Sequence, residues 1–142
     1  MKQITFALLV LSMLAMSCST TSYLIDEDSD WRFLGSKKVN HWRERDEFEI
    51  SNREKFTAIR LHAKERDIEI SEVRITLING DIIQPVVEKT IRNGERSRVI
   101  ELAADGRQLA KVEIRYSSYG KIFSKKATVL LVGKQFDPNG KY

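Results

Sequence analysis

The sequence predicts an all-β domain, an antiparallel β-sandwich or small barrel of about eight or nine short strands. From residue 31 onward, apolar and polar residues alternate with the period of two that places every second side chain on the same face of a strand. Three Asn-Gly or Asp-Gly pairs, which are typical of turns, interrupt this alternation at strand spacing, at 79–80, 93–94 and 105–106. No convincing amphipathic helix is present, and the connections are too short for parallel crossovers.

The first half of the domain contains three predicted strands. Short alternations occupy residues 31–39 and 47–50, and a longer one runs from 56 to 64. From residue 59 onward in the longer strand, apolar and polar residues alternate between two faces. The apolar face holds Ile59, Leu61 and Ala63, and the polar face holds Arg60, His62 and Lys64.

The next strand changes parity in its middle. The isoleucines of 68–70 lie at even positions, whereas the apolar residues of 73–77 lie at odd positions. A bulge near Ser71-Glu72 is therefore required to keep both sets facing the core.

A hairpin is predicted at Asn79-Gly80, since both central residues of a two-residue type I′ turn adopt positive φ. The second strand of this hairpin begins at Ile82 and soon meets Pro85. Proline has no backbone donor, so we expect this strand to lie at a sheet edge or to end early.

The remaining strands are predicted over 98–102, 109–116 and 127–132. The last of these is apolar at nearly every position and is expected to be buried on both faces. Residues 136–142, with Pro138, form a predicted tail.

The first 17 residues have the composition of a signal peptide. Lys2 precedes an apolar run of about thirteen residues, 4–16, which is shorter than the ~20 residues that span a bilayer. Ser17 is the small residue expected before a cleavage site. Residues 1–17 are therefore predicted to be a lipoprotein signal peptide.

Cys18 is the only cysteine of the chain, and the stretch before it resembles the lipobox of bacterial lipoproteins. The usual leucine stands one position early, at Leu14, which leaves Ala15 in its place. Acylation of Cys18 would anchor the protein stably to a membrane. An ordinary secreted protein is the alternative, but it leaves an odd cysteine unexplained. Ser19 follows the cysteine, and lipoproteins with a residue other than aspartate at that position are transferred to the outer membrane in proteobacteria. In this respect the chain resembles outer-membrane lipoproteins.

Two further regions follow the signal: a lipidated tether over 18–30 and a single β-sandwich domain over 31–142. Three alternate aspartates within 26–30 open like a calcium loop. However, Trp31 and Lys37 stand where that loop requires glycine and glutamate, so a solvated acidic linker is the better interpretation.

A set of short motifs occurs in a fixed order along the domain: Trp31-x-x-Leu34-Gly35, Phe56-x-Ala58-Ile59-Arg60-Leu61, Asn79-Gly80, Ile91-Arg92-x-Gly94, Arg98-x-Ile100-Glu101-Leu102, Arg107 and Val112-Glu113-Ile114-x-Tyr116. Together they resemble an uncharacterised family of small exported bacterial β-domains, described as a domain of unknown function. The resemblance covers about Trp31 to Gly133. It implies a β-rich fold and an envelope location, and it brings no catalytic or binding residue.

No pattern typical of a catalytic, metal or cofactor site is present. His41 and His62 lack the spacing of zinc ligands, and with Cys18 committed to lipid no thiol nucleophile remains. Neighbouring acids such as Glu47 and Glu49 are better explained as solubilising than as a glycosidase pair. Lysine and arginine total 24 against 20 acidic residues, a mixed charge that does not suggest nucleic-acid binding. We therefore expect a protein that is not an enzyme.

Six residues are candidates for ligand contact. The two tryptophans would either stack on sugar rings or fill the end of the sandwich. The basic residues of 60–64 and 111–115 would form one platform if their strands pair side by side, whereas the alternative is a solvated face partly neutralised by Glu101 and Glu113. The candidates are Trp31, Trp42, Arg60, Lys64, Lys111 and Arg115.

The expected function is that of a non-catalytic, membrane-anchored envelope lipoprotein whose β-domain binds another envelope protein, through an exposed strand edge near Pro85. The alternative is a binding module for an envelope glycan or lipopolysaccharide that uses the tryptophans and arginines.

Overall fold

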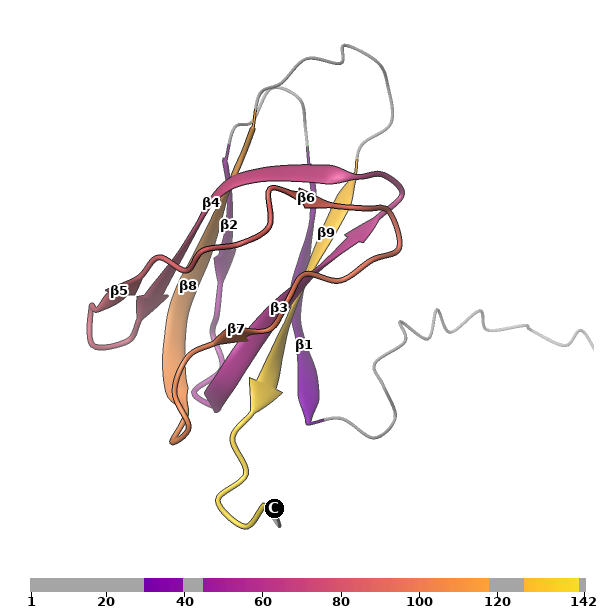
Figure 1. Ribbon diagram of the computed structural model, residues 1–142. Coiled ribbons are helices and arrows are strands. Elements are labelled where there is room, and N and C mark those ends of the chain that lie inside the picture. Colours follow the sequence, from indigo (N-terminus) through magenta and orange to yellow (C-terminus); the bar gives the residue numbers. More distant parts are fainter. Residues whose placement is uncertain (1–29, 40–44, 118–126, 141–142) are drawn as a thin grey trace, which may run out of the picture.

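The computed structural model describes residues 30–39, 45–117 and 127–140, and every element within them is a strand (Figure 1). All strand pairs are antiparallel, which confirms the predicted all-β class. The nine strands are β1 (Trp31–Lys38), β2 (Arg45–Glu49), β3 (Lys55–Lys64), β4 (Ile68–Leu77), β5 (Ile82–Ile83), β6 (Thr90–Ile91), β7 (Ile100–Glu101), β8 (Arg107–Tyr116) and β9 (Thr128–Gln135).

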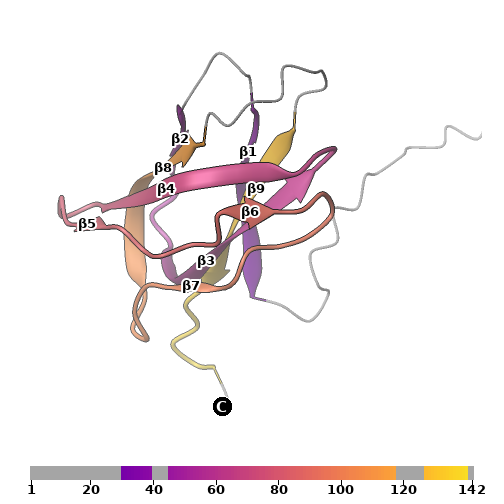
Figure 2. The same ribbon diagram turned by 45° about the horizontal axis from the view of Figure 1, so that its top comes forward.

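The strands form one continuous path, β1-β9-β3-β8-β4-β5, which folds into two layers. The path bends from one layer into the other between β3 and β8. These two strands pair only at Lys55 with Gln108 and at Phe56 with Arg107. Beyond this corner β3 continues beside β9 and β7, and β8 continues beside β4 and β2. We call β1, β9, β3 and β7 the β9 layer, and β2, β8, β4 and β5 the β8 layer (Figure 2).

The hydrophobic core fills the space between the two layers. Phe56, Ile59 and Leu61 of β3 are completely buried, as are Val112 and Ile114 of β8. Burying one such side chain contributes ~1.5 to 3 kcal/mol. The chain therefore folds into two layers because each layer has an apolar face to cover.

Several details of the predicted strand pattern are confirmed. Over residues 59–64 of β3, the apolar face is buried and the polar face is only half-buried. The register of β4 against β8 shifts between Ile70 and Glu72, where the parity change requires a bulge. Pro85 follows a strand of two residues that ends at Ile83. In β9, Val129 and Leu130 are both buried although they point to opposite faces.

The prediction of a two-residue type I′ turn at Asn79-Gly80 was wrong. Gly80 has φ +92°, whereas Asn79 is not among the residues with positive φ. The Gly80 N–H donates to the Leu77 carbonyl at 3.0 Å, and the Leu77 N–H donates to the Asp81 carbonyl at 2.8 Å. The loop therefore has three residues, 78–80, and only its last position needs left-handed backbone.

Candidate functional site

Three of the six candidate residues, Trp31, Arg60 and Lys64, gather on the outer face of the β9 layer. Arg60 lies opposite Val132 in the ladder, and Val132 lies opposite Phe33. Directly paired residues point to the same face, and so do residues two apart along a strand. β1 and β3 therefore place their aromatic and basic side chains side by side, across β9.

The outer face has its own apolar layer. Ala58, Leu130 and Val132 are buried, but they do not belong to the core cluster between the layers. Phe33 remains 47% exposed among them. This face therefore differs from an ordinary solvated sheet surface, in which the outward residues of the central strands are polar.

Trp31 and Arg60 form a cation–π stack. The Arg60 guanidinium carbon lies 4.8 Å from the centroid of the indole ring. Such contacts are worth ~0.5 to 2 kcal/mol, depending on how far they are removed from solvent. Both side chains are half-buried, and the Nε of Arg60 is buried with no hydrogen-bond partner. The stack therefore holds a planar cation in a fixed orientation on the surface.

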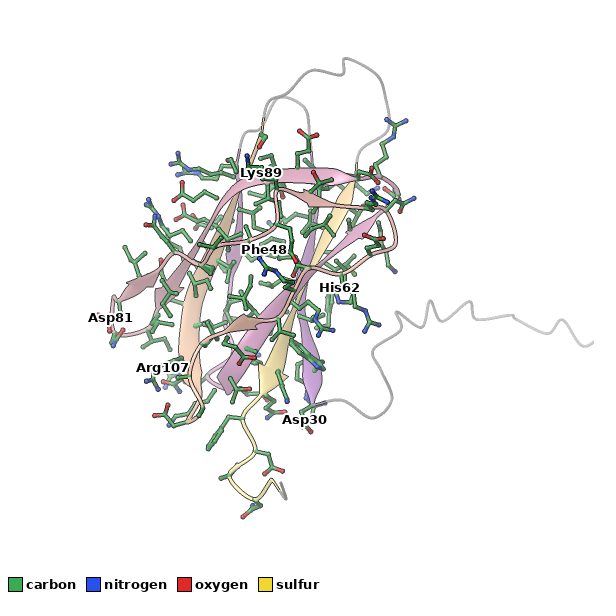
Figure 3. All side chains as sticks on the ribbon, viewed as in Figure 1. Asp30, Phe48, His62, Asp81, Lys89 and Arg107 are labelled. Carbon is green, nitrogen blue, oxygen red and sulfur yellow. The ribbon has the colours of Figure 1, made fainter. Side chains whose placement is uncertain are left out.

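His62 stands between Arg60 and Lys64 on β3. An isolated antiparallel β-bridge pairs its backbone with that of Arg96 on the adjacent segment. Burial lowers the pKa of His62 to about 4, and the positive charges of Arg96, Arg60 and Lys64 contribute in the same direction. The imidazole is therefore neutral at pH 7. Figure 3 shows His62 beside β3 and Phe48 between the layers.

Basic residues dominate the outward ladder positions of the β9 layer. Along β1, β9, β3, β7 and the segment before β7, five basic residues and one acidic residue stand at outward ladder positions. These are Lys38, Lys134, Arg60, Lys64 and Arg96, with Glu101 as the acid. Glu65 adds a second acid at the edge of this face, where it accepts a hydrogen bond from the Thr128 hydroxyl group opposite Lys64. Five basic residues against two acids leave the outer face of the β9 layer with a net positive charge.

The other two basic candidates, Lys111 and Arg115, lie on the opposite side of the sandwich, on the outer face of the β8 layer. Lys111 Nζ lies 3.3 Å from Glu47 Oε2, and Arg115 Nε lies 3.8 Å from Glu72 Oε2. Glu113 lies between them and is only 8% exposed. Its Oε1 forms an ion pair of 3.3 Å with Arg45. Basic and acidic side chains thus alternate across this face.

The hypothesis of a single basic platform that joins 60–64 to 111–115 was therefore wrong. It required β3 and β8 to pair along their length, but they separate into different layers after Phe56. The solvated alternative holds for the β8 layer, where Glu113 neutralises part of the charge. Trp42, Cys18 and His41 lie outside the described residues.

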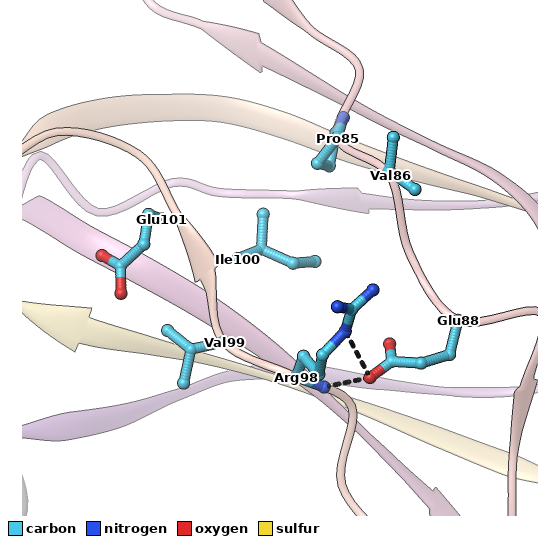
Figure 4. Close-up of a pocket in the computed structure, with 7 residues that line it drawn as sticks. All are labelled: Pro85, Val86, Glu88, Arg98, Val99, Ile100 and Glu101. Carbon is cyan, nitrogen blue, oxygen red and sulfur yellow. Dashed lines mark hydrogen bonds and ion pairs between the residues drawn. The ribbon is translucent and has the colours of Figure 1, made fainter.

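A second surface is an open groove of about 370 Å³ between the outermost segments of the two layers. Residues 85–88 form one margin and residues 98–101 form the other (Figure 4). Arg98 joins the margins, because its backbone N–H and its Nε donate to Glu88 Oε1 at 2.8 and 3.2 Å. Val86 is 90% exposed, whereas Ile100 is buried.

Sequence reasoning missed several residues of these surfaces. Phe33 and Val99 lay only within the predicted strand ranges 31–39 and 98–102, although an aromatic residue two positions from Trp31, on the same face of its strand, was a usable signal. Arg96 had no usable signal, because an isolated bridge rather than a regular strand brings it to His62.

The described parts of the chain offer no metal cluster and no membrane-spanning helix. Within residues 30–39, 45–117 and 127–140, no three histidine, cysteine or acidic side chains group in a way that would hold a metal ion. The same ranges contain no helix of the length and hydrophobicity needed to cross a bilayer.

Comparison with known proteins identifies the family. The model of a domain of unknown function, DUF2541, matches residues 6–133. The chain belongs to the DUF2541 family. This membership confirms the resemblance described from the motifs, although the DUF2541 match begins well before the limit of Trp31 that the motifs indicated. No functionally curated protein matches the sequence.

One solved structure with a similar fold is AlgX from Pseudomonas aeruginosa, at a TM-score of 0.48 and 18% sequence identity. The match covers 75% of this DUF2541 chain and 27% of the AlgX chain. The chain therefore spans about a quarter of the length of that protein.

Proposed function

We propose that this DUF2541 protein is a non-catalytic lipoprotein of the bacterial envelope, anchored in the outer membrane by lipid on Cys18, and that its β-domain binds another envelope protein. The open groove between residues 85–88 and 98–101 is the observation that supports a protein partner. The anchor rests on the lipobox-like residues before Cys18.

The groove has main-chain groups suited to an added strand. The Leu102 N–H donates to the Thr57 carbonyl at 2.8 Å, so the hydrogen-bonding groups of Leu102 face β3. Alternation along the strand then turns the N–H and C=O of Glu101 away from β3, toward the groove. An extended segment of a partner can pair with such an edge.

The side chains of the groove supply apolar contacts for the same segment. Val86 and Val99 are exposed on opposite margins, and Pro85 has no backbone N–H that could pair its own margin within the domain. Exposed apolar residues beside an open edge are the features by which strand addition gains affinity and specificity.

Site-specific photo-crosslinking in cells tests this proposal. A photoreactive amino acid in place of Val86 or Val99 is expected to give one discrete adduct with an envelope protein, and the same residue in place of Lys111 is expected to give none. The adduct formed from Val86 is expected to disappear when Val99→Asp places a charge in the groove. Equal adducts from Lys111, or no adduct from either valine, would contradict the proposal.

A glycan-binding module, for an envelope glycan or lipopolysaccharide, is the second candidate function. The stack of Arg60 on Trp31 favours it, because that stack presents a fixed cation and an aromatic ring on one face. The two candidates use different surfaces, so retention on a glycan and cross-linking at the groove are independent measurements.

A further inference from the structure

We propose that the outer face of the β9 layer is a binding site for an acidic polysaccharide, a sugar chain with carboxylate groups on successive residues. The site rests on the second candidate function and does not depend on the groove. The stacked Trp31 and Arg60, the exposed Phe33 and the charges of Lys64 and Arg96 are its parts.

Arg60 supplies the oriented cation. A guanidinium group binds a carboxylate through two parallel hydrogen bonds, and its planar form is largely preorganised. Stacking on Trp31 restricts the side chain further, so less rotational freedom is lost when a ligand binds. Because Nε is buried, the terminal amino groups are the part of Arg60 that can meet a carboxylate.

Phe33 supplies an apolar contact in the same row of the sheet. It is 47% exposed and lies across Val132 from Arg60. The faces of a sugar ring that carry C–H groups pack on aromatic rings, while its charged and hydroxyl groups bind polar neighbours. A ring that rests on Phe33 places its substituents toward Arg60.

The spacing of the cations favours a polymer over a single small anion. Arg60 and Lys64 are four residues apart on β3, about 13 Å along an extended strand. One carboxylate cannot bridge that distance, but carboxylates distributed along several sugars of one chain can. Neutral His62 lies between the two cations and offers one donor and one acceptor to sugar hydroxyls.

An anionic lipid surface would meet the same charges but fits the aromatic residues less well. Aromatic side chains that anchor proteins at a bilayer project into the headgroup region. Trp31 is instead half-buried, with the Arg60 guanidinium over its ring. A polysaccharide that lies flat on the face is therefore the better match.

Retention of the full chain, in neutral detergent, on immobilised polygalacturonate tests the site, with uncharged dextran as the blank. Retention is expected at low salt and is expected to fall as salt rises, because attractions between exposed charges are screened.

Two double variants with the same change in net charge provide the matched comparison: Arg60→Gln with Lys64→Gln, and Lys111→Gln with Arg115→Gln. The first is expected to weaken binding about tenfold or more, the loss typical of hydrogen bonds to charged groups. The second, on the opposite face, is expected to leave binding unchanged.

Arg60→Lys separates a built site from simple ion exchange, and it keeps the test decisive if a double variant fails to fold. The lysine keeps the charge but loses the planar group, so it is expected to weaken retention while the thermal unfolding midpoint stays near that of the native chain. Native retention by Arg60→Lys, or equal losses in the two double variants, would overturn the site. Binding to phosphatidylglycerol vesicles without retention on polygalacturonate would also overturn it, in favour of a membrane surface. Loss of the cross-link at Val86 would leave this result unaffected.

Discussion

The hydroxyl group of Tyr116 donates a 3.1 Å hydrogen bond to Oδ2 of Asp46, and this contact ties the end of β8 to the start of β2. Asp46 is only 6% exposed. Burial raises the pKa of Tyr116 far above its usual value, and the charge and hydrogen bond of Asp46 raise it further. The phenol therefore remains a donor across the physiological pH range.

Tyr116→Phe removes only the hydroxyl group and leaves the buried Asp46 carboxylate without this donor. We expect the free energy of unfolding to fall by ~1.5 to 3 kcal/mol, the range for hydrogen bonds to charged groups. Urea denaturation followed by circular dichroism measures the change. The double variant with Asp46→Asn supplies the control, since the two losses should not add if the pair interacts directly. A loss from Tyr116→Phe of less than about 0.5 kcal/mol, the usual range for surface substitutions, would contradict this role.

His62 predicts a specific dependence of stability on pH. Its folded pKa of about 4 is below the unfolded value of 6.5, so the unfolded chain binds the proton more tightly. The stability that this difference provides is complete above pH 6.5 and is lost as the pH falls toward 4. After allowance for solvent screening of a half-buried ring, the loss amounts to about 1 to 2 kcal/mol.

His62→Gln removes this titration while it keeps a polar side chain. The unfolding free energy of the variant is expected to change less than that of the native chain between pH 7 and 4. Urea titrations at several pH values measure the two slopes. Parallel slopes would show that burial and the neighbouring cations do not lower the pKa of His62 in the folded chain.

The arrangement of β3 was predictable because it is local. Alternation over residues 59–64 separates its apolar and polar faces, and no distant contact is needed to see it. The layer to which β8 belongs was not predictable in this way. It depends on two pairs at the corner, at Lys55 and Phe56, after which the strands diverge. The basic residues of β3 and β8 therefore lie on opposite faces although each strand was correctly predicted.

The turns also show that local sequence does not determine features that depend on strand pairing. Asn79-Gly80 marks the position of a hairpin correctly, because glycine takes the left-handed conformation there. The turn type depends on how the two flanking strands are paired, and Thr76 lies opposite Ile82. That register leaves room for three loop residues, together with the pair Leu77 and Asp81, instead of a two-residue turn.

Two glycines with positive φ allow conformational strain to be separated from steric contact. Gly94 has φ +82° and open space where a Cβ would stand, whereas at Gly106, with φ +73°, a Cβ would lie 2.8 Å from Phe136 Cβ and 2.9 Å from Lys55 Cβ. Alanine at either site costs ~1 to 2 kcal/mol for the left-handed backbone. Gly106→Ala is expected to cost ~1 to 3 kcal/mol more than Gly94→Ala because of overpacking. Thermal and urea unfolding measure both variants, and equal losses would show that the neighbours of Gly106 move aside freely.

Cys18 is predicted to carry the lipid that anchors the chain. The prediction rests on the apolar run before it and on the small Ser17 at the cleavage position. Cys18→Ala is expected to abolish incorporation of a radioactive fatty acid and to move the protein out of the membrane fraction, because no other cysteine can accept the lipid. Ser19→Asp is the matched control: it should keep the label, and it should shift the protein from the outer to the inner membrane if the host sorts lipoproteins by the residue after the cysteine. Unchanged labelling of Cys18→Ala would exclude the anchor, and the apolar segment would then have to be explained as an ordinary secretion signal.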